Sequence, residues 1–414
     1  MGSARWRRWL AGGAAAAVIA VVVAVALSGG AGGRHRGTTA ISTPTTSSST
    51  ATGTATSTST ATSTSTATTP APGLPAPAGE QFGASVNRLF NDPGWTAAQI
   101  DAQLGTLHAA GATAARADAL WEASEPSAPS AGAHHYDWTF DDRIAQALAA
   151  HALAWLPILD YSAPWAQSIP GQDHSPPRSA ADYAAYAGAF AARYGSGGSF
   201  WAAHPDLPAD PVTTYEIWNE PDNGEFWTPA PDAAAYAALY LAARSAIDSA
   251  QPGARVIVGG LTRPVAFLPA MLAAAPQLAG HIDGVAIHPY GTTAVVVSRI
   301  RAARATLSGL GMAAVPLYVT EFGWTTDPPG AVDYLPAARR PAEIVATLTA
   351  LGHLACGVAA AILYTWVTPE RTPTDSGDWY GINAPDGAAT AGSRAFTTGL
   401  RAARRPGPAA PCAT

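Results

Sequence analysis

The feature that most limits what this chain can fold into is an alternation of short apolar runs with alanine-rich stretches. Between about residues 79 and 405, eight apolar runs of strand length are separated by segments long enough for helices. The expected strands are residues 82–86, 113–117, 155–159, 214–218, 255–259, 284–287, 317–320 and 360–365. Strands that alternate with helices in this way pair in parallel.

The segments between these strands predict helices that return the chain to the start of the next strand. Expected helices include residues 96–110, 141–151, 182–194, 231–250, 293–310 and 341–353. Eight such units in about 325 residues fit a closed α/β barrel, the (β/α)8 or TIM barrel. A doubly wound open sheet is the alternative, but no Gly-x-Gly-x-x-Gly turn follows the first strand. We therefore predict a TIM barrel.

The first thirty residues have the pattern of a targeting segment. Three arginines precede an uncharged, mostly apolar run of 18 residues, from residue 10 to residue 27. Its length lies between a signal-peptide core and a full membrane span, and residues 24–26 offer a small-x-small cleavage site. Residues 1–30 are thus a signal peptide or a signal anchor. Both predict an extracellular or cell-surface protein, and the second makes residues 10–27 a membrane tether.

The next segment has no pattern that could build a core. Of the 32 residues from Thr38 to Thr69, 24 are serine or threonine. Such a segment buries too little apolar surface to offset the entropy lost on ordering. We predict that residues 31–78 are a disordered Ser/Thr/Pro-rich linker that carries O-linked sugars. Residues 79–405 would then form the barrel domain, and residues 406–414 a C-terminal tail.

Polar side chains stand where the predicted strands end. In barrels of this kind the functional side chains gather at the carboxyl ends of the strands. Two glutamates, Glu220 after the fourth strand and Glu321 after the seventh, would face each other across the barrel mouth. The full set at these ends is Asn87, Arg116, Asp118, Asp160, Tyr161, Asn219, Glu220, Gly259, Gly260, His288, Pro289, Tyr290, Glu321 and Trp366.

Paired carboxyl groups are what the cleavage of a glycosidic bond requires. One gives a proton to the leaving oxygen, and the other, ionised, attacks carbon or activates water. Arg116 could keep one carboxylate ionised by charge pairing, and Tyr290 could donate a hydrogen bond to the same group. Flat apolar faces for a stacked sugar ring would come from Trp165, Trp218, Trp227, Trp324 and Trp366.

Several motifs resemble those of a known group of enzymes. "WNEP" at 218–221, "AIHPY" at 286–290 and "TEFGW" at 320–324 resemble clan A glycoside hydrolases, particularly families 39 and 5. "RADALWEASEP" at 116–126, "YDWTFDDRIAQAL" at 136–148 and "LPILDYSAPWA" at 156–166 are similar to family 39 members. The resemblance covers about residues 81 to 400.

This resemblance implies a retaining glycoside hydrolase that cleaves a poly- or oligosaccharide by double displacement. It implies that Glu220 is the acid/base and Glu321 the nucleophile, with the two carboxyl groups about 5–5.5 Å apart. Glu220, walled by tryptophans and without an evident cationic partner, would hold its proton near neutral pH. By the same resemblance, Asn219 contacts the sugar 2-hydroxyl, Arg116, His288 and Tyr290 support the nucleophile, and Trp366 is the floor of the cleaved-sugar subsite.

Barrels of this fold also serve other functions. A transglycosylase would use the same site, and a non-catalytic carbohydrate-binding barrel would keep the fold alone. A metal-dependent barrel hydrolase would need a His-x-His pair at the first strand end, where the sequence reads "FGASVN". We therefore expect no metal and no cofactor. A net charge of −6 gives no basic surface for nucleic acid. From the resemblance we expect a carbohydrate partner, and we also expect a monomer.

The chain has two cysteines, Cys356 and Cys412. Export would permit a disulfide between them. Cys356 lies between the last predicted barrel helix and the eighth strand, at the bottom of the barrel. A terminal helix over about residues 391–404 would bring the tail to that same face. A bridge and two free thiols both remain open at this point.

Overall fold

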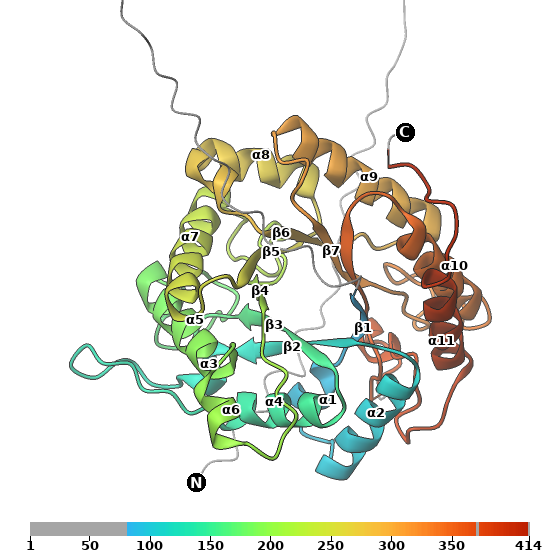
Figure 1. Cartoon of the computed structure of the whole chain (residues 1–414), viewed down its shortest axis with the longest axis horizontal. Helices are drawn as coiled ribbons and strands as arrows, with labels where there is room; N and C mark the ends of the chain where they lie inside the picture. The colour runs from blue at the N-terminus through green and yellow to red at the C-terminus, as the bar shows by residue number, and fades with distance from the viewer. Residues whose placement is uncertain (1–80, 370–371, 413–414) are drawn as a thin grey trace, which may run out of the picture. The chain divides into compact units, whose positions relative to one another are not determined.

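The structure, a computed structural model, describes residues 81–369 and 372–412. Within them, eight parallel strands form a closed barrel in the order β1 to β8, with helices around the outside (Figure 1). The predicted TIM barrel is therefore confirmed. The targeting segment and the linker predicted for residues 1–78 lie outside the described residues. No helix of the described part is long and apolar enough to cross a membrane.

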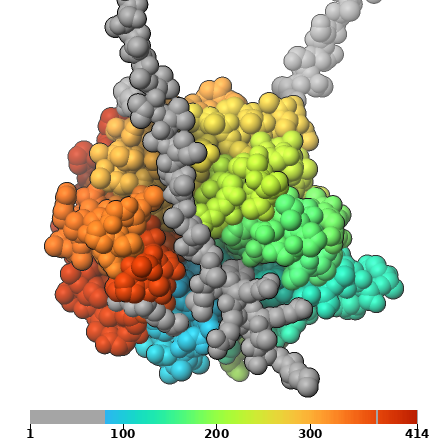
Figure 2. Space-filling view, turned by 180° about the vertical axis from the view of Figure 1, so that it is seen from behind, coloured from blue at the N-terminus to red at the C-terminus, as the bar shows by residue number. Residues whose placement is uncertain are grey.

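All eight predicted strands are present, with ends shifted by a few residues. They are β1 (Gln81–Ser85), β2 (Ala114–Leu120), β3 (Ala154–Asp160), β4 (Thr214–Ile217), β5 (Arg255–Leu261), β6 (Gly284–Ile287), β7 (Leu317–Phe322) and β8 (Val358–Leu363). Each pairs with its neighbours in sequence, and β8 closes the barrel on β1. In the space-filling view the colours follow one another around the molecule, because each β/α unit lies beside the next (Figure 2).

The six predicted helices are present as well. They are α2 (Ala97–Ala109), α4 (Thr139–Ala150), α5 (Ala180–Tyr194), α7 (Ala233–Ala250), α9 (Thr293–Gly309) and α10 (Arg340–His353), and α11 (Ala391–Ala403) follows β8. One barrel helix, α8 (Pro264–Ala274), was absent from the expected set. It contains Pro269, which normally interrupts a helical pattern. Short helices α1 (Asn87–Asn91), α3 (Trp121–Ser124) and α6 (Ser199–Ala203) and two 3-10 turns, η2 (Pro276–Gly280) and η3 (Ser376–Trp379), complete the described part.

An apolar layer fills the lower part of the barrel interior. It is a cluster of Ala114, Leu156, Ile257, Ala286, Tyr318, Ala359, Ala360 and Ile362. Because successive strand residues point to opposite faces, Arg116 and Asp118 share the inner face with Ala114. Asp160 shares the inner face of β3 with Leu156 for the same reason. The strand period therefore places charged groups directly above an apolar floor.

The C-terminal segment is tied to the bottom of the barrel. Cys356 and Cys412 form a disulfide, with their Cα atoms 4.9 Å apart. Next to it, the Ala355 amide donates to the Ala410 carbonyl at 2.9 Å, and Leu354 and Ala410 form a parallel bridge. The bridged alternative for the two cysteines is the one the structure contains.

We predict that Cys412→Ser lowers the free energy of unfolding by about 4 kcal/mol, since it releases the loop that the disulfide closes. Denaturant titration of the oxidised protein and of the variant measures the difference. Reductant is the matched control, because it should destabilise the parent protein by a similar amount and leave the variant unchanged. Two free thiols in the denatured, unreduced protein would contradict the bridge.

Candidate active site

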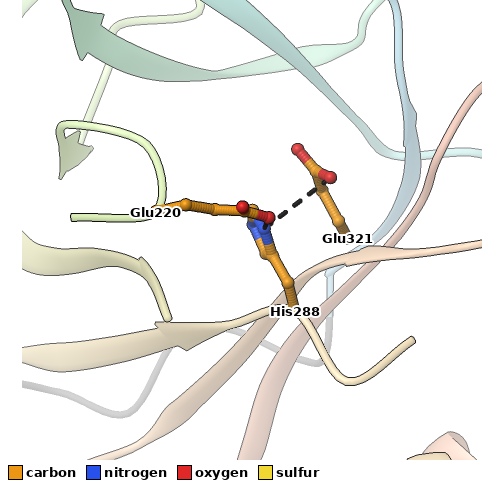
Figure 3. Close-up of side chains that lie close together, drawn as sticks. All are labelled: Glu220, His288 and Glu321. Carbon is orange, nitrogen blue, oxygen red and sulfur yellow. Dashed lines mark hydrogen bonds and ion pairs between the residues drawn. The ribbon is translucent and has the colours of Figure 1, made fainter. Parts of the chain in front are cut away.

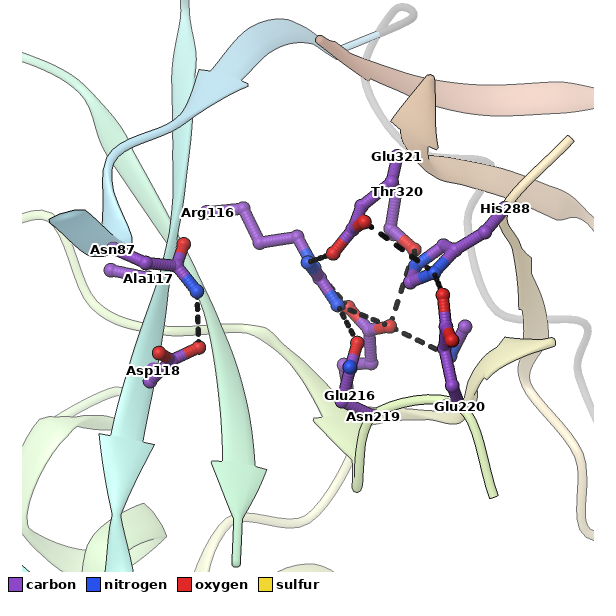
Figure 4. Close-up of polar contacts among 12 residues, drawn as sticks. Asn87, Arg116, Ala117, Asp118, Glu216, Asn219, Glu220, His288, Thr320 and Glu321 are labelled. Atoms are coloured by element: carbon purple, nitrogen blue, oxygen red, sulfur yellow. Dashed lines mark hydrogen bonds and ion pairs between the residues drawn. The ribbon is translucent and has the colours of Figure 1, made fainter. Parts of the chain in front are cut away.

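Arg116 is the centre of the polar group at the barrel mouth. Its side chain is fully buried, and its Nε and Nη2 donate to the two carboxylate oxygens of Glu216 at 2.8 and 3.1 Å. Nη1 donates to Glu321 at 2.6 Å, and Nη2 also donates to the Asn219 side-chain oxygen at 3.0 Å. One guanidinium therefore joins β2, β4 and β7, and it orients both Asn219 and Glu321 (Figure 4).

Glu321 is held in its ionised form by these neighbours. Its second oxygen accepts a hydrogen bond from the Tyr290 hydroxyl at 2.6 Å. Burial alone would raise the pKa of Glu321. The charges of His288 and Arg116 and the hydrogen bond from Tyr290 outweigh burial and hold that pKa below its usual value. A carboxylate that stays ionised at neutral pH is suited to attack an electrophilic carbon.

Glu220 is held on both of its oxygens. Oε1 lies 2.7 Å from Nδ1 of His288, and Oε2 accepts from the Asn223 amide at 2.7 Å. His288 also lies 3.7 Å from Glu321, so the imidazole stands between the two glutamates (Figure 3). The expectation that Glu220 has no cationic partner is wrong. The "AIHPY" motif brings His288 to it from β6, a contact that spacing along the chain does not reveal.

A chain of hydrogen bonds decides which imidazole nitrogen of His288 carries a fixed proton. The Thr320 hydroxyl donates to Glu216 at 3.2 Å, and that carboxylate, paired with Arg116, can only accept. The same hydroxyl oxygen lies 3.1 Å from Nε2 of His288 and is left to accept from it. Nε2 therefore carries a proton, and a second proton is shared between Nδ1 and Glu220.

The pKa of His288 follows from the same contacts. Burial of the ring lowers its pKa, but the charge of Glu321 and the hydrogen bond with Glu220 outweigh this and raise it above the usual value. Gly260 makes room for the ring. A Cβ atom at Gly260 would lie 1.9 Å from Nε2 of His288, so no larger residue fits there. The Gly260 amide also donates to Glu216 at 2.9 Å.

The backbone that presents Glu220 is bent sharply. Trp218 and Glu220 have φ angles of 65° and 46°, in the left-handed region that residues other than glycine rarely adopt. The strand β4 ends at Ile217 for this reason, and Glu220 turns from the strand direction toward His288. Backbone strain of this kind is found at functional sites, where surrounding contacts hold it in place. Here Trp218 is fully buried and anchors the turn.

The two glutamates lie close together. One carboxylate oxygen of Glu220 and one of Glu321 lie within 4.8 Å of each other, and His288 completes the group. Within the described residues this is the group whose donor atoms could surround a metal ion. The oxygens of Glu321 already accept hydrogen bonds from Arg116 and Tyr290, and one oxygen of Glu220 accepts a hydrogen bond from Asn223. The donor set therefore fits a pair of hydrogen-bonded acids better than a set of free metal ligands.

The tryptophans expected as sugar platforms lie mostly inside the protein. Four of the five are at most 3% exposed, namely Trp218, Trp227, Trp324 and Trp366. Trp366 packs on Phe396 of α11, so its ring is not open to a sugar. Trp165 is half-buried, packs edge-on against Trp121 and donates to the Glu125 carbonyl. The expectation of exposed indole faces fails for those four, because large rings fill the space between strands and helices.

The site also contains residues that the sequence patterns did not indicate. Glu216 and Thr320 carry the hydrogen bonds beneath the glutamates, and Asn223 holds Glu220. A signal for Glu216 exists, since it is an acid on the inner face of a buried strand in a chain with 13% charged residues. Half-buried rings at the mouth come instead from Tyr161, Phe226, Tyr364 and Tyr380.

The comparisons with known proteins rest on structure. No protein-family model and no curated protein matches the chain. Similar solved structures include a GH39 enzyme from Xanthomonas axonopodis pv. citri, at 20% sequence identity and a TM-score of 0.59. A monomeric beta-xylosidase from Caulobacter crescentus CB15 is 21% identical, with a TM-score of 0.60. A GH5_18 protein from Bifidobacterium longum subsp. infantis is 14% identical, with a TM-score of 0.56.

These similarities cover most of the barrel. The first two cover 78% of this chain and 67% and 68% of the other chains, and the third covers 80% of each. At such low identities the likeness is one of fold. The resemblance to family 39 and family 5 glycoside hydrolases that the motifs indicated is thus confirmed in the architecture.

We predict that Tyr290→Phe moves the acid limb of the pH–rate profile upward by about one to two pH units. If Glu321 reacts as a carboxylate, turnover falls as pH drops through its pKa, and losing the Tyr290 hydroxyl raises that pKa. The profile of kcat/KM against pH on an aryl glycoside measures the shift. Tyr240→Phe is the control, since it removes a buried hydroxyl that bonds the Val256 carbonyl on the outside of the barrel. An unmoved acid limb in a folded Tyr290→Phe protein would refute the role.

Proposed function

We propose that the protein is a retaining glycoside hydrolase that acts on a poly- or oligosaccharide. The observation that carries the proposal is the pair of carboxyl groups with oxygens within 4.8 Å of each other, one held ionised and the other sharing a proton with His288. Inverting enzymes need a wider gap, about 6.5–9.5 Å, to hold a water between the two groups. The fold shared with GH39 and GH5 structures supports the same reaction.

In the first step, Glu321 attacks the anomeric carbon of the sugar. The bond from that carbon to the leaving oxygen breaks as the carbon–oxygen bond to Glu321 forms. The proton shared by Glu220 and His288 passes through Glu220 to the leaving oxygen, which departs as an alcohol. Arg116 and Tyr290 stabilise Glu321 before attack and leave it a good nucleophile and a good leaving group.

In the second step, water releases the sugar. Glu220, now deprotonated, takes a proton from a water molecule, whose oxygen attacks the anomeric carbon and displaces Glu321. Two inversions leave the anomeric configuration unchanged. His288 can return to its earlier hydrogen bond with Glu220 once the proton is back, because Thr320 and Glu216 keep the imidazole in place throughout.

We also propose that the protein works outside the cytoplasm, as a monomer. The N-terminal pattern supports export, and the disulfide between Cys356 and Cys412 supports an oxidising compartment. One structurally similar protein is itself described as a monomeric beta-xylosidase.

The division of labour between the glutamates gives a direct test. Glu321→Ala should lower kcat by about 10⁴-fold or more on every substrate, since no nucleophile remains. Glu220→Ala should lower kcat by about 10²–10⁴-fold on a substrate with a poor leaving group. It should cost far less on a dinitrophenyl glycoside, whose leaving group needs no proton, and the glycosyl-enzyme should accumulate.

Asp206→Asn is the control and should leave turnover unchanged, because Asp206 is an exposed acid on the loop between α6 and β4, at the opposite end of β4 from Glu220. Mass spectrometry of the trapped glycosyl-enzyme should place the sugar on Glu321. NMR of the first product should show retained anomeric configuration. An inverted product, or a label on another residue, would overturn the proposal.

A further inference from the structure

A second polar group lies across Arg116 from the glutamates. Asp118 accepts a close hydrogen bond from the Asn87 amide and another from the Asn91 amide at 2.6 Å. Figure 4 shows Asn87 and Asp118 on one side of Arg116, with Glu220 and His288 on the other. We call the group of Ser85, Asn87, Asn91, Asp118 and Asp160 the aspartate pocket. The reaction proposed above uses none of its members.

The aspartate pocket holds polar atoms without protein partners. Within residues 81–369 and 372–412, Ser85 Oγ and one side-chain oxygen each of Asn87, Asn91 and Asp160 have no hydrogen-bond partner. Ser85 is fully buried, and Asp160 is 1% exposed. Both lie on the inner face of the barrel, since Ser85 pairs with Arg116 in register and Asp160 shares a face with Leu156.

Buried oxygens without partners are costly, and a ligand that brings donors would lower that cost. Three of the four unpartnered atoms are carbonyl or carboxyl oxygens, so the complementary ligand is rich in O–H donors. A sugar ring with neighbouring hydroxyls has this chemistry. Asn87 and Asn91 are half-buried and Asp118 is 8% exposed, so a ligand at the mouth reaches these three before Ser85 and Asp160.

The electrostatic surroundings disfavour a further negative charge. Burial raises the pKa of Asp160, and the charge of Asp118 raises it further. Burial also raises the pKa of Asp118, against the opposing effects of Arg116 and the two asparagine amides. The burial and the nearby acids that resist ionisation of these two groups would act equally on the carboxylate of a bound uronic acid.

The position of the pocket fixes which part of a substrate it would meet. The leaving group must lie beside Glu220, which protonates it, while the anomeric carbon lies at Glu321. The sugar that stays on the enzyme therefore extends over Arg116 toward Asp118. We propose that Asp118 and Asp160 select this retained sugar, an inference that rests on the proposed function. They bind hydroxyls of a neutral sugar and reject a sugar that carries a carboxylate.

The full-length protein gives the first test, with pairs of 4-nitrophenyl glycosides that differ only at C6. A neutral hexoside should have a kcat/KM about a hundredfold or more above that of its uronide, in the gluco and galacto series. Equal or faster cleavage of the uronide overturns the selection and leaves the proposed function standing. If no glycoside is cleaved, the binding of D-glucose, D-galactose and their uronic acids is measured by tryptophan fluorescence and tests the selection instead. Preferential binding of a neutral sugar then supports the selection, and no binding or a preference for a uronic acid overturns it.

Variants test whether the preference for a neutral sugar comes from the aspartate pocket. Asp118→Asn should lower kcat/KM on the neutral substrate by about ten- to a hundredfold and narrow the neutral-to-uronide ratio by about tenfold. Asp160→Asn keeps the shape and adds an NH2 group that can donate to a bound carboxylate, so it should narrow the ratio even if Asp118→Asn does not fold. Asp101→Asn is the charge-matched control, since Asp101 lies on α2 with 73% of its side chain exposed. A ratio unchanged in a folded pocket variant, or narrowed equally in Asp101→Asn, would refute the assignment.

Discussion

The buried ion pairs of Arg116 are the interaction on which the rest of the site depends. Removing a guanidinium and two carboxylates from water costs several kcal/mol for each ion, and only near-ideal geometry recovers that cost. Arg116 reaches it by bonding both oxygens of Glu216, one oxygen of Glu321 and the side chain of Asn219. Removing one charged partner of Arg116 would leave an uncompensated buried charge. The site is therefore built as a unit, and neither glutamate has an independent position.

The closed barrel makes this unit achievable. Arg116 and Glu321 are separated by 205 residues along the chain, yet their side chains meet because β2 and β7 both end at the barrel mouth. Below them lies an apolar layer that includes Leu156 and Ile257. That layer excludes water from the charges above it, which strengthens their interactions and makes their geometry matter more. The strands supply rigidity, and the loops that follow them supply the half-buried aromatic rings at the barrel mouth.

The two sides of the site are held in different ways. Glu321 is fixed by donors that favour its ionised form, Arg116 and Tyr290. Glu220 shares a proton with His288, which the Thr320 hydroxyl connects to Glu216. Because Glu216 is also bound to Arg116, the positions of the acid and of the nucleophile are coupled through one carboxylate. Two groups of the same residue type thereby have different partners, a guanidinium and a phenol for Glu321 and an imidazole and an amide for Glu220.

Patterns along the chain predicted the barrel, its eight strands and the two glutamates, because strand periodicity and the acids that follow the strands are local features of the chain order. It also placed His288 and Tyr290 after a strand end, whereas Arg116, expected at the end of its strand, lies inside β2. The folded structure added that His288 contacts Glu220, that Glu216 lies beneath both glutamates, and that Trp218 and Trp366 are buried. Those facts depend on side-chain direction and on packing between strands that are far apart in sequence. The disulfide between Cys356 and Cys412 was likewise open until the fold set the ends of the chain beside each other.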